Sequence, residues 1–189
     1  AGYPDRVARR RAPNADRLVL ASGTGARLAR ESGVHDAEFL VAVDVTAGAA
    51  GPRAEALVRL ATRVEEDWLE PSSIDVEHAI DGEGVVRAVR RDRYDQLVLR
   101  EHHVAPDAAT AARLVAAEYV RRGPSEADAH LMHRLAFAGL SIPFAELVGV
   151  ASTGAMRIAD VRLDAHVPAD ARRALDREAP ATLTLPGGR

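Results

Sequence analysis

The chain has 189 residues, of which 47% are hydrophobic and 28% charged, a composition typical of a globular protein with one or two small domains. The absence of cysteine excludes a disulfide scaffold, a thiolate metal site and a cysteine nucleophile. No apolar run approaches the roughly 20 residues of a membrane helix, and no signal peptide opens the chain, so we expect a cytoplasmic protein without a membrane partner. Because the first residue is Ala1 and not Met, we expect a piece of a longer protein.

The net charge of -3 hides a strong segregation of charge. Residues 1–30 hold seven arginines against two acids, whereas residues 31–83 hold three arginines against thirteen acids. Every basic residue is arginine, whose planar guanidinium can pair with phosphate or carboxylate through two hydrogen bonds. This segregation indicates one surface that faces a polyanion and another that faces a partner.

Short segments of alternating polarity dominate residues 17–103. The period of two is typical of half-buried strands and occurs at 17–22, 38–45, 74–80, 85–90 and 94–99. In the segment 38–45, this period of two places Leu40, Ala42 and Asp44 on one face. Together the segments predict a small antiparallel barrel.

Two segments are harder to assign. The arginine-rich stretch 3–11 is predicted to form the last turns of a helix, with Pro4 near its first turn. Residues 53–70 fit one long helix by periodicity, and they also fit a strand followed by a short helix.

The second half of the chain is predicted to be mainly helical. Helices are expected over 108–122, from the N-cap Ser125 to about residue 137, and over 169–178. Pro143, Gly149 and Gly154 interrupt the region between the last two helices. A final strand is expected at 182–185, where it looks truncated.

No catalytic signature is complete. The chain lacks the lysine of a phosphate-binding loop, and Ser152 has no neighbouring base. His130 and His133, with Asp128 nearby, have a spacing that could hold a metal, which leaves a small metal hydrolase as a weak alternative. We therefore predict no catalytic residue, no metal site and no cofactor in this chain.

Three blocks in order resemble the region after the motor core in HrpB-type helicases of the DEAH/RHA class. They are YPDRVARRR at 3–11, LASGTGARL at 20–28 and EFLVAVD at 38–44. The tail APATLTLPGGR at 179–189 is similar to a further block of the family, with Thr182 where the family has histidine. The resemblance is weakest over 141–158, where the family is longer and carries tryptophan-containing helices.

The resemblance implies an α+β fold, a small antiparallel OB-like β-barrel followed by a mainly helical C-terminal part. We expect a helical lead-in at 1–12, the barrel at 13–104 and the helical segment at 105–189. For 53–70 the resemblance implies a strand and then a helix. The two motor lobes, with their ATP and Mg²⁺ sites, would precede Ala1.

The function expected from this resemblance is that of an accessory region of an ATP-dependent RNA helicase. The partners would be the helicase lobes and single-stranded RNA held by its backbone, without base readout. Basic patterning and resemblance together predict the RNA-binding residues Arg6, Arg9, Arg10, Arg11, Arg17, Ser22, Thr24 and Arg27. Replacing the Arg9–Arg11 run together is expected to weaken binding without unfolding the barrel. The alternative is a scaffold that docks on the lobes and does not touch RNA.

Overall fold

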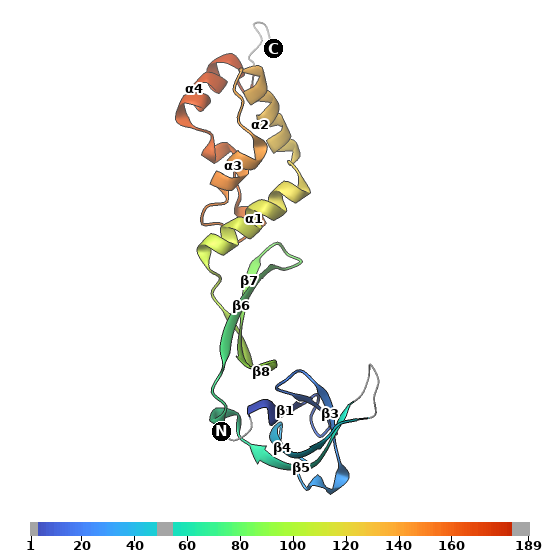
Figure 1. Cartoon of the computed structure of the whole chain (residues 1–189). Helices are drawn as coiled ribbons and strands as arrows, with labels where there is room; N and C mark the ends of the chain where they lie inside the picture. Colours follow the sequence, from blue (N-terminus) through green and yellow to red (C-terminus); the bar gives the residue numbers. More distant parts are fainter. Residues whose placement is uncertain (1–3, 49–54, 183–189) are drawn as a thin grey trace. The chain divides into compact units, whose positions relative to one another are not determined.

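A computed structural model describes residues 4–48 and 55–182, and its first part is a closed five-stranded barrel (Figure 1). The strands run in the order β1-β2-β3-β5-β4 around the barrel, and pairing of β1 with β4 closes it. The pair β3–β5 is parallel and the other pairs are antiparallel. The strands are β1 (Val7–Arg10), β2 (Arg17–Leu20), β3 (Gly25–Leu28), β4 (Phe39–Thr46) and β5 (Ala56–Val64). The predicted OB-like barrel is thus confirmed.

Small and large side chains alternate across the interior of the barrel. Ala8 on β1 faces Leu20 of β2 on one side and Leu40 of β4 on the other, and all three are buried. Alanines are needed because five strands enclose too little space for a large side chain at every inward position. The buried interior consists of Ala8, Leu18, Leu20, Ala26, Leu28, Leu40, Ala42, Ala56, Val58 and Ala61.

The prediction of a helix over 3–11 is wrong. Only Pro4–Arg6 form a turn of 3-10 helix (η1), and Val7–Arg10 form the strand β1. The strand forms because its inward residues fill the barrel while its outward residues contact a second apolar cluster, an arrangement with a period of two. The barrel therefore extends over 7–64 and not over the expected 13–104.

A β-bulge in β4 changes the face predicted for Asp44. Leu40 and Ala42 point into the barrel as expected, but the register with β5 shifts between Ala42 and Val45. Beyond this irregularity Val45 packs against the barrel interior and Asp44 is exposed. The extra residue in a bulge reverses the alternation of the side chains that follow it.

The ambiguous segment 53–70 forms a strand and then a short helix, as the family resemblance implies. Its described part is β5 followed by the 3-10 turn η3 (Glu66–Trp68). The helical spacing of its apolar residues was misleading, because Ala56 and Val58 fill the barrel while Trp68 is 71% exposed.

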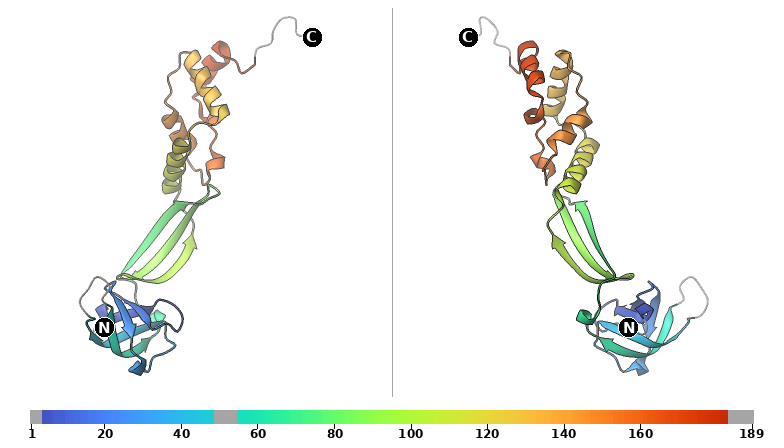
Figure 2. Two further views of the ribbon diagram at one scale, coloured as in Figure 1. Left: turned by 90° about the vertical axis from the view of Figure 1, so that its right-hand side faces the viewer. Right: turned by 60° about the vertical axis from the view of Figure 1, so that its left-hand side comes forward.

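A separate antiparallel sheet of three strands follows the barrel (Figure 2). Its strands are β6 (Ser73–Ile80), β7 (Val86–Tyr94) and β8 (Leu97–Val104). The first two match the predicted hairpin, but the strand expected over 94–99 is interrupted by a turn at Asp95, where φ is 53°. Leu97 and Leu99 of β8 pack on the outward residues Val7 and Phe39 of the barrel.

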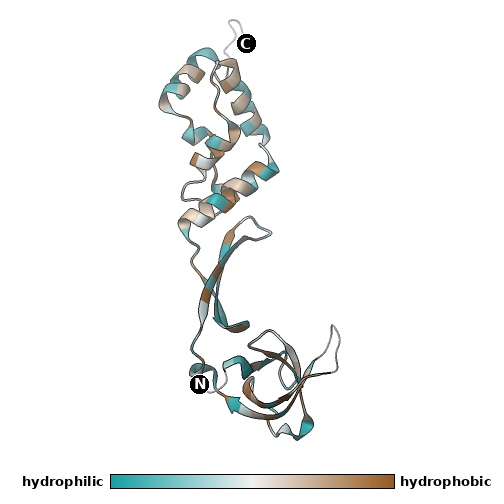
Figure 3. Cartoon of the chain, in the orientation of Figure 1, coloured by the Kyte–Doolittle hydropathy of each residue, from teal (hydrophilic) through white to brown (hydrophobic). Residues whose placement is uncertain are grey.

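The chain divides into two compact units, residues 1–76 with 89–103 and residues 77–88 with 104–189. The second unit contains the helices, which carry both hydrophobic and hydrophilic residues along their length (Figure 3). The helices are α1 (Ala108–Arg122), α2 (Glu126–Phe137), α3 (Phe144–Ala151) and α4 (Ala169–Glu178), with short 3-10 turns η4 (Ile158–Asp160) and η5 (Asp164–His166). None of the described helices is long and apolar enough to cross a bilayer.

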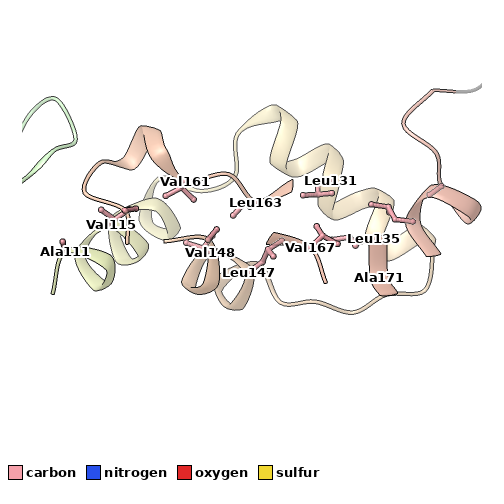
Figure 4. Close-up of a cluster of buried hydrophobic side chains, with 14 of the residues drawn as sticks. Ala111, Val115, Leu131, Leu135, Leu147, Val148, Val161, Leu163, Val167 and Ala171 are labelled. Carbon is pink, nitrogen blue, oxygen red and sulfur yellow. The ribbon is translucent and has the colours of Figure 1, made fainter. Parts of the chain in front are cut away.

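Three of these helices begin and end where the sequence predicts, and α3 was missed. Pro143 precedes α3 as its N-cap, where the N–H that proline lacks would have no hydrogen-bond acceptor within the helix. Gly149 lies inside the helix, which is held by its buried residues Leu147, Val148 and Ala151. These side chains join the apolar interior of the helical unit (Figure 4). The strand expected at 182–185 lies outside the described residues, apart from Thr182.

A buried carboxylate fixes the junction between α1 and α2. One oxygen of Asp128 accepts hydrogen bonds from the Tyr119 hydroxyl at 2.6 Å and from the Ser125 hydroxyl at 2.6 Å. The Ser125 N–H also donates to this oxygen, which completes the capping box of α2. Burial, together with the hydrogen bond to Asp128 and its charge, raises the pKa of Tyr119 to about 12. The hydrogen bonds from Ser125 and Tyr119 outweigh burial and lower the pKa of Asp128.

The variant Asp128→Asn is expected to lower the free energy of unfolding by about 1–2 kcal/mol, because it weakens both the cap and the tertiary hydrogen bond. The pKa of Tyr119 should move down toward its ordinary value of 10.0. Thermal unfolding and the absorbance of the tyrosinate measure these two effects.

Because folding lowers the pKa of Asp128, the ionised carboxylate stabilises the fold at pH values above the pKa that Asp128 has in the unfolded chain. This stabilisation is lost as the pH falls through the pKa that Asp128 has in the folded protein. The stability difference between the variant and the wild type should therefore narrow below about pH 4. Glu126→Gln, in the same helical turn, is the control and should leave the Tyr119 titration in place. An unchanged titration in Asp128→Asn would contradict this account.

Candidate nucleic-acid interface

Four predicted arginines lie on one outer surface of the barrel, formed by β1, β2 and β3. Arg17 of β2 is paired in register with Arg27 of β3, and the N–H of Arg11 donates to the carbonyl of Arg17 at 3.0 Å. These three residues therefore form one row across neighbouring strands, where side chains on one face lie about 5 Å apart. Arg9 lies two residues before Arg11 and points to the same side. We call the outer surface carrying Arg9, Arg11, Arg17 and Arg27 the arginine face.

The side chain of Arg11 reaches the start of β3, where it lies in van der Waals range of Gly25. A Cβ atom placed on Gly25 would lie 3.5 Å from a terminal nitrogen of Arg11 and 3.7 Å from Cγ of Glu55. The guanidinium of Arg11 thus lies over Gly25 at the start of β3, beside the Val19–Gly25 pair and two residues along β3 from Arg27. Among the described residues, Arg11 has no ion pair.

Carboxylates pair with the other three arginines of the arginine face. Arg9 contacts Glu38 at 2.7 Å and Arg27 contacts Asp16 at 2.7 Å. Arg17 and Glu55 are 3.7 Å apart, a looser pair. The hydrogen bond from Arg27 is the main reason that the pKa of Asp16 is lowered.

A cleft of about 790 Å³ borders the arginine face. Its walls come from the end of β1, the loop between β1 and β2, and the start of β8, and both Arg9 and Arg11 line it. Arg9 is held there by a hydrogen bond to the carbonyl of Val98 at 2.5 Å and by the ring of Phe39, whose centroid lies 5.4 Å from its guanidinium carbon. The loop between the first two strands and the surface of strands 2 and 3 are the parts of an OB barrel that bind oligonucleotides.

Arg10 does not belong to the arginine face. It alternates with Arg9 and Arg11 along the strand, so it points inward, and it is 7% exposed. Its Nε donates to the carbonyl of Ala37 at 2.6 Å. Its terminal nitrogens donate to the carbonyls of Ala15 and Val34. Arg10 therefore ties the β1–β2 loop and the segment before β4 to the end of the barrel.

The remaining predicted residues lie apart from this row. Arg6 donates to the carbonyl of Val43 at 2.8 Å, at the bulge in β4, which indicates a structural role. Ser22 and Thr24 lie in the β2–β3 turn, at the opposite end of the hairpin from Arg17, and the hydroxyl of Ser22 donates to that of Thr24 at 3.0 Å.

The acids that pair with the arginine face are not among the site residues predicted from the sequence. Each of these acids directly precedes a strand: Asp16 precedes β2, Glu38 precedes β4 and Glu55 precedes β5. No spacing in the sequence links any of them to its arginine, because the pairs are created by the register of the barrel. Trp68 is exposed, next to Glu66 and Asp67, which both pair with Arg100.

The alternative metal site on α2 lacks a third ligand. His130 and His133 line a shallow depression with Glu126, but the carboxylate of Asp128 is turned toward Ser125 and Tyr119. Across residues 4–48 and 55–182, no three histidine or acidic side chains converge as a metal site requires.

Arg10→Met should lower the free energy of unfolding by roughly 3 kcal/mol, because three carbonyl groups at the end of the barrel lose their donor. Thermal or urea unfolding measures the change. Arg11→Met, one residue further and on the outside, is the control and should leave the stability unchanged. Equal losses in the two variants would contradict the inward position of Arg10. Because Arg10 holds three carbonyl groups, we now expect replacement of the whole Arg9–Arg11 run to destabilise the barrel.

Comparison with known proteins supports the fold. No protein-family model matches the chain, and no curated protein matches it. The crystal structure of the E. coli DExH-box NTPase HrpB is similar over 99% of this chain, with a TM-score of 0.50 and 23% sequence identity. A crystal structure of the E. coli DEAH/RHA helicase HrpB gives a TM-score of 0.47 at 22% identity. The chain spans 27% of the length of each of these proteins. The predicted resemblance to HrpB is confirmed as a likeness of fold.

Proposed function

We propose that this chain is an accessory region of an ATP-dependent RNA helicase and that its arginine face holds the backbone of single-stranded RNA. The observation that supports this function best is the row of Arg11, Arg17 and Arg27 across three neighbouring strands. The row lies on the surface that OB barrels use for oligonucleotides, beside the cleft lined by Arg9. The fold that the chain shares with HrpB links this surface to a helicase.

The chemistry of the arginine face favours phosphate over bases. Guanidinium groups form paired hydrogen bonds with phosphate oxygens. Sequence-independent binding through stacking requires exposed aromatic rings, and Phe39 is buried beneath Arg9. The proposed binding is therefore weak, sensitive to salt and independent of base sequence.

In this proposal ATP hydrolysis belongs to motor lobes outside this chain. The chain contains no lysine and hence no complete phosphate-binding loop of the common type. ATP and Mg²⁺ would bind to those lobes, and the region described above would supply contacts to RNA and to the lobes. Such a helicase would work in the cytoplasm.

A second candidate function is that of a scaffold that docks on the motor lobes without touching RNA. The exposed Trp68 favours it, because a tryptophan that is 71% exposed offers a large apolar contact to a protein partner. Its acidic neighbours Glu66 and Asp67 would favour a basic partner and oppose RNA.

Fluorescence anisotropy with a labelled oligouridine of about 12 nucleotides, a length that one OB barrel can cover, tests the choice. Arg11→Ala should weaken binding about threefold to tenfold, which corresponds to the roughly 0.5–1.5 kcal/mol that one typical hydrogen bond contributes in net terms. It should also make the slope of log affinity against log salt concentration shallower by about 0.7, because one phosphate contact is lost.

Arg173→Ala removes an exposed arginine from α4 and serves as the control for the change in net charge. Oligothymidine should bind within a few-fold of oligouridine, because phosphates and not the 2′-hydroxyl are recognised. The absence of binding by the wild-type chain, or equal losses in Arg11→Ala and Arg173→Ala, would move the assignment to the scaffold.

A further inference from the structure

We infer that the acids of the arginine face act as built-in competitors of RNA phosphate. Glu38, Asp16 and Glu55 would occupy Arg9, Arg27 and Arg17 in the free protein and be displaced when a phosphate binds. This inference rests on the proposed RNA binding, and it adds to it a set of residues that lower the affinity.

Each carboxylate occupies the guanidinium edge that a phosphate would use. Glu38 accepts from Nε of Arg9 at 2.9 Å and also contacts a terminal nitrogen at 2.7 Å. Asp16 accepts from Nε of Arg27 at 2.7 Å. Carboxylate and phosphate oxygens match the planar fork of donors in the same way, so one excludes the other from that edge.

The pairs are exposed enough to open. The side chains of Arg27 and Asp16 are 63% and 51% exposed, and that of Glu38 is 57% exposed. Exposed ion pairs contribute little to stability, so a phosphate can replace such a carboxylate without unfolding the barrel. Glu38 also lines the cleft together with Arg9, which places the competing carboxylate inside the proposed path of the RNA.

The arginine face thus contains both an unpaired arginine and three arginines that carboxylates occupy. Arg11 has no ion pair among the described residues and is ready to bind a phosphate. Arg9, Arg17 and Arg27 become available only when their acids are displaced. The consequence is a surface that holds RNA weakly and releases it easily, although it carries four arginines.

The inference predicts that neutralising an acid tightens RNA binding. Asp16→Asn and Glu38→Gln should each raise the affinity for the labelled oligouridine about twofold to fivefold, the range expected for an exposed charge pair. Each should also steepen the slope of log affinity against log salt concentration by up to about 0.7, because the displaced carboxylate of the wild type takes up a cation that offsets one of those released from the RNA. Glu55→Gln should have the smallest effect, since its pair with Arg17 is the loosest at 3.7 Å.

Asp176→Asn on α4 changes the net charge by the same amount in the other unit and is the control. Thermal unfolding of each variant, followed by circular dichroism, is the control for an intact barrel. Tighter binding and a steeper slope in Asp16→Asn and Glu38→Gln, but not in Asp176→Asn, support the inference. If the wild type binds and these variants bind equally well or more weakly, the inference is overturned while the proposed function stands. If neither the wild type nor the variants bind, the proposed function fails and the inference fails with it.

Discussion

The alternation of side chains along β1 is the constraint on which the rest of the barrel depends. Three consecutive arginines cannot all face one side of a strand, so Arg10 is buried at the end of the barrel while Arg9 and Arg11 point outward. The inward arginine finds three backbone carbonyls and holds the loops at one end of the barrel. The outward arginines are thereby placed beside β2 and β3, where the row of guanidinium groups forms.

Electrostatic balance then determines what this surface can bind. Unpaired guanidinium groups on one face would repel one another, and neighbouring acids relieve this repulsion at three of the four arginines of the arginine face. Since the pairs are solvent-exposed, they add little to the stability of the barrel. Under the proposed function, these acids would therefore weaken the attraction of the arginine face for RNA.

Most of the secondary structure follows from local patterns in the sequence. The helices α1, α2 and α4 begin and end at their predicted residues because their caps, such as Ser125 and Gly123, are local signals. The arginine-rich start and α3 were misread, since an inward arginine and a helix with an internal glycine are decided by tertiary packing. The bulge in β4 likewise depends on closure of the barrel and leaves no local signature.

The candidate site was predictable in composition but not in geometry. The sequence indicates which arginines are clustered along the chain, and the family resemblance points to the OB barrel. Cross-strand register decides that Arg17 and Arg27 stand side by side and that Arg6 and Arg10 do not join them. Register also creates the ion pairs, which join residues up to 38 positions apart.

The most direct measurement is an NMR titration of the arginine side-chain Nε–Hε resonances with oligouridine. The account predicts that the signals of Arg9, Arg11, Arg17 and Arg27 shift together with saturation at one affinity, while that of the buried Arg10 and those of the arginines in α1 and α4 stay in place. Shifts confined to the helical unit, or spread evenly over all arginines, would contradict the assignment of RNA binding to the arginine face.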